Sequence, residues 1–149
     1  VLIGLAISIM GLMDILTQIF IMPRLLKLAN EDKLIRLALA CEIIAYLLFA
    51  LSAFSKMWPF FILAMFIFAF GDSIFGTAFN GKLSKSATSS EQGKLQGGSQ
   101  ALQALTRVIG PLIGGQIYIS LGHFAPALMG FIFLIIALLV LSKTKSDQE

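Results

Sequence analysis

Five long apolar stretches restrict what this chain of 149 residues can fold into. They lie at about residues 1–22, 34–54, 58–79, 96–120 and 124–142. An α-helix needs roughly 20 mostly apolar residues to cross a hydrocarbon core of about 30 Å, and each stretch is close to that length. The stretches are too long for barrel strands and do not alternate between apolar and polar residues. The sequence therefore predicts an all-α integral membrane protein with five transmembrane helices.

The composition agrees with a chain whose solvent is lipid. Hydrophobic residues make up 58% of the chain and charged residues 13%, whereas soluble domains contain roughly 25% charged residues. The formal net charge is +3. Because membrane topology explains a small basic excess, the charge gives no reason to expect a nucleic-acid partner.

The placement of lysine and arginine predicts the orientation of the helices. Cytoplasmic loops of membrane proteins carry an excess of these residues. One side of the predicted membrane holds Arg24, Lys27, Lys33, Arg36, Lys82, Lys85, Lys94, Lys143 and Lys145. The other side holds only Lys56. We therefore expect a multi-pass protein of the cell membrane, with its amino end outside and the tail 143–149 in the cytoplasm.

The sequence contains no motif of a soluble enzyme. It has no GxGxxG after a strand, no GxxxxGK[ST], no HExxH and no GxSxG. Cys41 is the only cysteine, so no intrachain disulfide and no cysteine metal cluster is expected. We expect no enzymatic activity, no cofactor and no bound metal. Because the chain begins inside an apolar helix without a methionine, we also expect it to be a fragment of a longer protein.

Four ionisable residues lie inside the predicted spans, at Asp14, Glu42, Asp72 and Arg107. Charged residues near the membrane centre cost roughly 2.5–3.5 kcal/mol each on insertion scales, so each requires an explanation. The three acids lie about 12 Å from the cytoplasmic end of their spans, and Arg107 lies about 16 Å from it. Similar depths predict that Arg107 meets at least one acid within the membrane.

Such a meeting has two interpretations. In one, Arg107 forms a structural ion pair that holds two helices together. In the other, a carboxylate that separates from Arg107 takes up a proton and loses it when the pair forms again. The second interpretation is what proton coupling requires, and the sequence leaves both open.

Asp14 and Asp72 are the better candidates for proton coupling. Asp14 shares a helix face with Gln18, and the same face carries small residues nearer the amino end of the helix. Asp72 shares a face with Gly76 and Asn80, and only the phenylalanines near these residues are expected to line a pocket. A polar stripe of this kind suits a cavity.

Glu42 is different, because its neighbours three and four residues away are apolar. No polar stripe leads to its carboxyl group. We therefore interpret Glu42 as a residue with a structural partner.

The fourth span carries a polar face. Gln96, Gln100, Gln103 and Arg107 follow one another at steps of four, three and four residues, so their side chains point the same way. In lipid, such a face requires a protein or water partner.

The same span contains small residues and a proline. Two pairs with small-xxx-small spacing, which permits close approach of another helix, are Gly93 with Gly97 and Gly110 with Gly114. Pro111 removes a backbone hydrogen bond and favours a bend. With Gly115 beside them, these residues predict a helix that packs closely and bends or slides against a neighbour.

Taken together, these segments resemble the carboxyl-terminal half of a major facilitator superfamily transporter. The resemblance rests on GLMDILTQIFIMPRLLK, SSEQGKLQG and QALTRVIGPLIGGQIY, in that order, and covers nearly the whole chain. The last block looks like the eleventh helix of the drug–proton antiporter branch, which includes tetracycline efflux proteins. The charged loop signature of the family survives only loosely at residues 23–33.

The resemblance implies that the five spans are helices eight to twelve of a twelve-helix fold, and that helix seven and the amino-terminal half are missing. It implies alternating access, with a small amphipathic substrate exchanged for protons at a cavity lined by helices eight, ten and eleven. Asp14, Asp72 and Arg107 would then be the coupling residues, and Gln18, Gln100 and Gln103 would contact the substrate in the cavity. Two alternatives stay open: transport of a sugar or other polar metabolite, or a non-transporting remnant of a disrupted gene.

Overall fold

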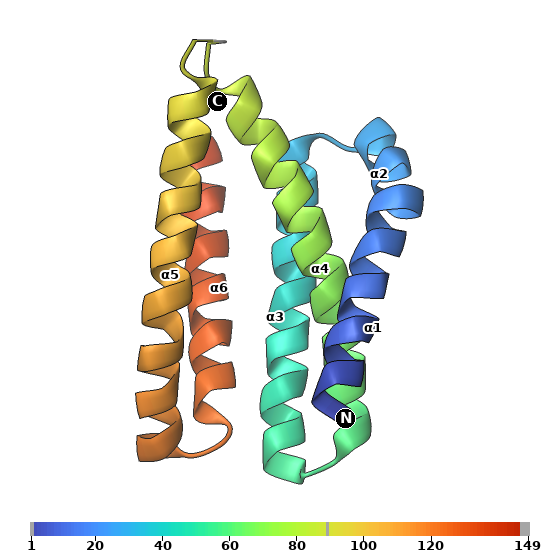
Figure 1. Ribbon diagram of the computed structural model, residues 1–149, viewed down its shortest axis with the longest axis vertical. Coiled ribbons are helices and arrows are strands. Elements are labelled where there is room, and N and C mark those ends of the chain that lie inside the picture. Colours follow the sequence, from blue (N-terminus) through green and yellow to red (C-terminus); the bar gives the residue numbers. More distant parts are fainter. Residues whose placement is uncertain (1, 89, 147–149) are drawn as a thin grey trace.

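The computed structural model describes residues 2–88 and 90–146, and every regular element in this part of the chain is a helix. Figure 1 shows them standing side by side as a bundle. In chain order they are α1 (Leu2–Leu16), the π-helical turn η1 (Thr17–Ile21), α2 (Met22–Leu28), α3 (Glu31–Ser55), α4 (Trp58–Lys85), α5 (Gln92–Leu121) and α6 (Ala125–Ser146). The all-α prediction is confirmed.

Five helical segments are long and apolar enough to cross a membrane, counting α1, η1 and α2 as one continuous helix. These candidate spans are Ile7–Leu28, Glu31–Ser55, Trp58–Lys85, Gln92–Leu121 and Ala125–Lys143. Their number and order match the prediction. Of the predicted first span and tail, residues 1 and 147–149 lie outside the described residues.

The helices continue past the predicted apolar spans at the end of the bundle where α2 and α4 finish, which we call the basic end. The predicted loop 23–33 shrinks to Ala29 and Asn30, and the predicted loop 80–94 shrinks to residues 86–91. Hydropathy marks the part of a helix that suits hydrocarbon, and polar residues can continue the helix beyond it. Lys82 and Lys85 in the last turn of α4 favour this, because cations stabilise a helix carboxyl end.

The π-helical turn η1 was not predicted from the sequence. Its wide geometry is closed by Met22, whose backbone N–H donates to the carbonyl of Thr17 five residues earlier. Pro23 follows directly and lies in the first turn of α2. A proline lacks an N–H and its ring crowds the carbonyl four residues before it, and a wider turn relieves that crowding. The helix therefore passes Pro23 without ending.

The core lies mainly between α3 and α4, which form an antiparallel hairpin, with Met22 packing against it. Its buried members are Met22, Leu34, Ile35, Ala38, Leu39, Ile74 and Ala78. Gly71 lets the two helices approach closely. A Cβ atom at Gly71 would lie 3.1 Å from the Ala38 carbonyl oxygen and 3.2 Å from Cγ of Glu42.

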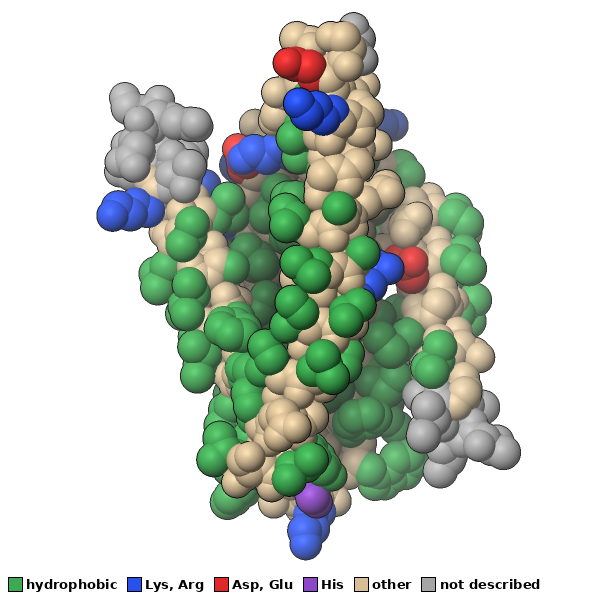
Figure 2. Space-filling view, turned by 60° about the vertical axis from the view of Figure 1, so that its left-hand side comes forward, with side chains coloured by type: hydrophobic (Ala, Val, Ile, Leu, Met, Phe, Trp, Pro, Cys, Tyr) green, Lys and Arg blue, Asp and Glu red, His purple; other side chains and the backbone are tan. Residues whose placement is uncertain are grey.

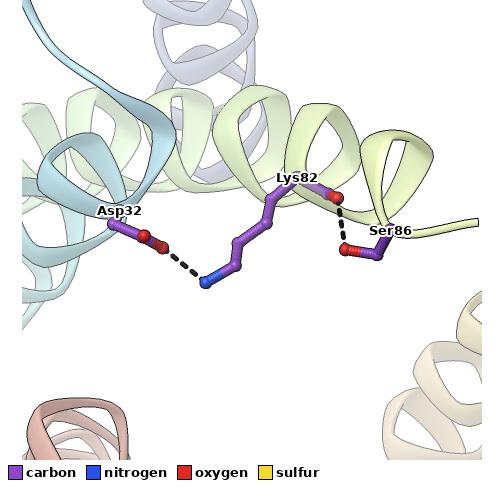
Figure 3. Close-up of polar contacts among 3 residues, drawn as sticks. All are labelled: Asp32, Lys82 and Ser86. Carbon is purple, nitrogen blue, oxygen red and sulfur yellow. Dashed lines mark hydrogen bonds and ion pairs between the residues drawn. The ribbon is translucent and has the colours of Figure 1, made fainter. Parts of the chain in front are cut away.

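Two ion pairs join α3 to α4 at the basic end. Glu31 pairs with Lys85, and Asp32 pairs with Lys82, as Figure 3 shows for the second pair. The acids lie in the first turn of α3 and the lysines in the last turn of α4, where both signs of charge suit the helix dipoles. Both side chains of the Asp32–Lys82 pair are 46% exposed, so we expect it to stabilise the fold by at most about 1 kcal/mol.

Helix α5 is the least covered of the five candidate spans, since it is the one in which none of the described residues is buried. It runs without interruption from Gln92 to Leu121 with Pro111 inside it, next to α6 (Figure 1). No other atom would lie within 4 Å of a Cβ built on any of its candidate packing glycines, which are Gly93, Gly97, Gly110, Gly114 and Gly115. Their role in helix packing therefore stays a prediction about a partner outside the described residues.

Candidate functional site

A polar cavity of about 900 Å³ lies between the first helix, α4 and α5. We call it the α1–α4–α5 cavity. Figure 2 shows basic and acidic side chains facing each other at mid-height between two helices, away from the charged ends. The lining residues are Asp14, Gln18, Asp72, Ser73, Phe75, Gly76, Thr77, Phe79, Asn80, Ser99, Leu102, Gln103, Thr106 and Arg107. The cavity thus collects most of the candidates that the sequence indicated from three separate spans.

The first helix contributes a hydrogen-bonded pair. Nε2 of Gln18 donates to Oδ1 of Asp14 at 3.0 Å, as the four-residue spacing on one helix face predicts. Gln18 lies in the π-helical turn, whereas Asp14 lies in α1 just before it. The carboxyl group is therefore oriented by a neutral amide rather than by a cation.

Helix α4 contributes Asp72 and a series of polar or small residues that follow it toward the carboxyl end of the helix. Gly76 and Asn80 line the cavity with Asp72, as the shared face predicts. Phe75 and Phe79 also line it, and their rings stack with centroids 5.5 Å apart and planes 9° apart. The prediction that phenylalanines close to Asp72 and Gly76 line a pocket agrees with this wall, but the prediction that only these do so is wrong, because Phe61 of α4 lines a second cavity.

Helix α5 contributes the basic side of the cavity. Arg107 and Gln103 both line it, and Nε2 of Gln103 lies 3.4 Å from Oγ of Ser99. Gln100 lines a smaller hollow of about 370 Å³, which it shares with Asn80, Gln103 and Arg107. Gln100 thus lies beside the α1–α4–α5 cavity and is absent from its wall.

The charges of the cavity are close enough to influence one another. Asp72 interacts electrostatically with both Asp14 and Arg107. In the described part of the chain, no carboxylate oxygen lies within 4.0 Å of the Arg107 guanidinium group. The arginine and the acids therefore face a shared cavity without forming a closed ion pair.

The sequence analysis missed several hydroxyl-bearing residues of the wall. Ser73 is buried, and its Oγ has no hydrogen-bond partner among the described residues. Thr77 donates to the Ser73 carbonyl oxygen at 3.1 Å, and Thr106 donates to the Gln103 carbonyl oxygen at 2.8 Å. Serine and threonine are common in membrane helices because they bond to their own backbone, so their positions alone carried little information.

A second cavity, of about 870 Å³, lies between α3, α4, α5 and α6 and is mainly apolar. Its aromatic lining includes Tyr46, Phe49 and Phe61. Neither cavity holds a metal-binding cluster: among residues 2–88 and 90–146, no group of three His, Cys, Asp or Glu residues is placed to hold an ion.

Comparison with known proteins places these features in a family. Residues 1–149 match the sequence profile of the Major Facilitator Superfamily. Over 116 residues the chain is 30% identical to the class C tetracycline resistance protein of Escherichia coli and to the class H tetracycline resistance protein of Pasteurella multocida. These alignments cover 78% of this chain but only 28% of each relative. No solved structure matches the chain.

Proposed function

This chain belongs to the Major Facilitator Superfamily of transporters, and on that premise we propose that it forms part of a proton-coupled exporter of drugs or other small amphipathic compounds. The observation that carries the proposal is the meeting of Asp14, Asp72 and Arg107 in one cavity between three helices. Two acids and one arginine around a space of about 900 Å³ provide both a proton-binding group and room for a small molecule.

The proposed mechanism depends on the distance between Arg107 and the acids. When the guanidinium group is close, it stabilises the charged form of a carboxyl group and favours release of a proton. When the helices move apart, the unpaired carboxylate in a poorly solvated cavity takes up a proton. A carboxyl group that alternates between these states as the cavity opens to one side and then the other couples proton movement to transport.

The substrate class follows from the wall of the cavity. The stacked rings of Phe75 and Phe79 offer apolar surface, whereas Gln18, Asn80 and Gln103 offer amide groups. A compound with aromatic rings and several polar substituents would match both kinds of surface. Both relatives described above are tetracycline resistance proteins, which supports an amphipathic drug as substrate.

The proposal includes a partner within the same protein. The chain spans about 28% of the length of the relatives it matches, and one side of α5 is uncovered. We propose that it works together with further transmembrane helices of a longer polypeptide, with the carboxyl end of this chain in the cytoplasm of the cell. The substrate cavity would then be completed by helices outside this chain.

A second candidate function is transport of a sugar or another polar metabolite. The amides and hydroxyl groups along the cavity favour it, because such groups hydrogen-bond to sugar hydroxyls. The two candidates differ in which compound competes for the cavity.

Transport by the complete polypeptide in proteoliposomes distinguishes them. Under an imposed pH gradient, we expect uphill movement of a fluorescent amphipathic drug, collapse of that movement by a protonophore, and competition by tetracyclines but not by hexoses. Competition by hexoses alone would favour the metabolite transporter. Uphill movement of the drug that continues unchanged in the presence of the protonophore would contradict proton coupling.

A further inference from the structure

Glu42 is a buried acid that the proposed mechanism does not use. It lies in the middle of α3 and is only 9% exposed. The residues that surround it on α3 include Ala38 and Ala45, both fully buried. In the described part of the chain, Glu42 has neither a salt bridge nor a side-chain hydrogen bond. The structural partner that the sequence analysis assigned to Glu42 is therefore absent from these residues.

An ionised carboxylate is poorly stabilised in such a place. Burial removes the water that stabilises its charge, and a protein compensates with a cation or with hydrogen-bond donors. Glu42 has neither in the described residues, so its surroundings favour the neutral acid. A neutral carboxyl group needs only one acceptor for its proton and is tolerated among alanines far better than an anion.

The group that faces Glu42 most directly lies on α4. Cγ of Glu42 packs against Gly71, where an added Cβ would lie 3.2 Å away, and Asp72 is the next residue along α4. Glu42 and Asp72 interact electrostatically across this contact. Asp72 in turn interacts with Asp14 and Arg107 in the cavity. Glu42 thus does not line the cavity itself but interacts electrostatically with Asp72, which does.

The remaining ionisable groups around Glu42 do not neutralise it. On α3 itself these are Cys41, which is adjacent, Tyr46 one turn later and Arg36 nearly two turns earlier. Helix α6, which packs against α3, carries no ionisable residue between Ala125 and Ser142. Two acids on neighbouring helices therefore influence each other with no nearby cation on α3 or α6 to offset their repulsion.

We propose that Glu42 and Asp72 form an interacting carboxyl pair across the α3–α4 contact at Gly71, in which Glu42 holds a proton while Asp72 is ionised. Two carboxylates that repel each other disfavour double ionisation, so the pair binds and releases protons as a unit. Only one consequence rests on the proposed function: in a proton-coupled transporter, Glu42 would act as a positioning residue that controls the protonation of Asp72. The pair itself requires no transport.

Infrared spectroscopy tests the pair directly. The 149-residue chain is reconstituted in lipid nanodiscs, and spectra are recorded in H₂O and D₂O across a pH series. At neutral pH we expect a C=O stretching band of a protonated carboxyl group that shifts in D₂O. Glu42→Gln should remove this band. Glu31→Gln, which alters an acid that is paired with Lys85 at the surface, should leave it unchanged.

Three results would overturn the proposal. One is the absence of a protonated carboxyl band from the wild-type chain at neutral pH. Another is a band that Asp72→Asn removes while Glu42→Gln leaves it in place. The third concerns coupling: if Asp72→Asn leaves the pH at which the Glu42 band disappears unchanged, the two acids do not form a pair.

A folding control keeps the test decisive. Helix content and elution volume should match those of the wild type before spectra are compared. Should Glu42→Gln fail to fold, Glu42→Asp keeps a carboxyl group and moves the band to a different frequency, which assigns it by another route. Failure of the drug transport assay would leave these spectra unaffected, so the two proposals are tested separately.

Discussion

The ring of Tyr46 on α3 lies directly over Gly130 on α6. A Cβ atom built on Gly130 would lie 2.6 Å from Cδ1 of the ring and 2.9 Å from Cζ, closer than real Cβ contacts allow. The ring has little freedom to withdraw, because it also meets Phe49 and Phe68 edge to face, with centroids 6.1 Å and 5.8 Å away. The absence of a side chain at Gly130 therefore sets how closely α6 can approach α3.

This contact predicts that Gly130→Ala destabilises the bundle. Overpacking a tight contact costs about 1–3 kcal/mol, so the unfolding temperature in detergent should fall clearly. Gly114→Ala on α5 is the matched control, because nothing lies within 4 Å of its Cβ position. In a Tyr46→Ala background the cost of Gly130→Ala should largely disappear. An equal loss of stability in both backgrounds would show that the ring is not the cause.

The topology predicts the side from which the loop between α4 and α5 is accessible. With Cys41 replaced by alanine, a cysteine at Ser86 or Ser90 should react with a membrane-impermeant maleimide only from the cytoplasmic side. A cysteine at Lys56, in the opposite turn, should react only from the outside. The reason is the concentration of lysine and arginine at the basic end. Reaction of Ser86→Cys from the outside would contradict the orientation.

A second-site effect is predicted for Arg107. Removing its charge by Arg107→Ala leaves Asp72, with which it interacts, facing Asp14 without a nearby cation. We expect loss of uphill transport by the complete polypeptide. Asp72→Asn should partly restore expression or transport, because it removes the charge left unbalanced. Asp14→Asn should restore less, since Asp14 is held by Gln18. Restoration by neither substitution would contradict the interaction.

We expect neutralisation of the cavity acids to separate substrate binding from proton coupling. Asp14→Asn and Asp72→Asn keep the size of the side chain but remove the titratable group. Each should abolish pH-driven uphill export while downhill exchange of substrate continues at a reduced rate. Asn80→Ala, in the same wall but without a titratable group, should alter substrate affinity and leave coupling intact. Uphill export by the double Asp variant would place the coupling site elsewhere.

Much of the fold was accessible from the sequence because lipid imposes a simple rule. A helix that crosses hydrocarbon must be apolar for about 20 residues, so hydropathy alone gives the number and order of the helices. The same rule makes an intramembrane charge conspicuous. Asp14, Asp72 and Arg107 stood out for this reason, and the structure brings all three to one cavity.

Other features depend on distances between helices, which periodicity does not contain. A shared face correctly grouped Gln100, Gln103 and Arg107, which line one hollow, yet it could not show that Gln100 is absent from the wall of the adjoining α1–α4–α5 cavity. The apolar neighbours of Glu42 set it apart from the other acids but gave no sign that the facing residue on α4 would be adjacent to Asp72. Equal depth predicted a meeting of charges and could not give their separation.

The wide turn η1 also determines which side of the first helix faces the rest of the bundle. Thr17 and Met22 are both buried, although residues five apart on a regular α-helix point about 140° away from each other. The additional residue in the turn brings them back into angular phase. Every residue of α1, including Asp14, takes its orientation relative to α2 from this turn. Closing the same residues into a regular α-helix would rotate Asp14 about 100° relative to α2, whereas deleting one residue from η1 would give a regular helix that keeps nearly the present phase, so the orientation of the acid depends on the wide turn that follows it.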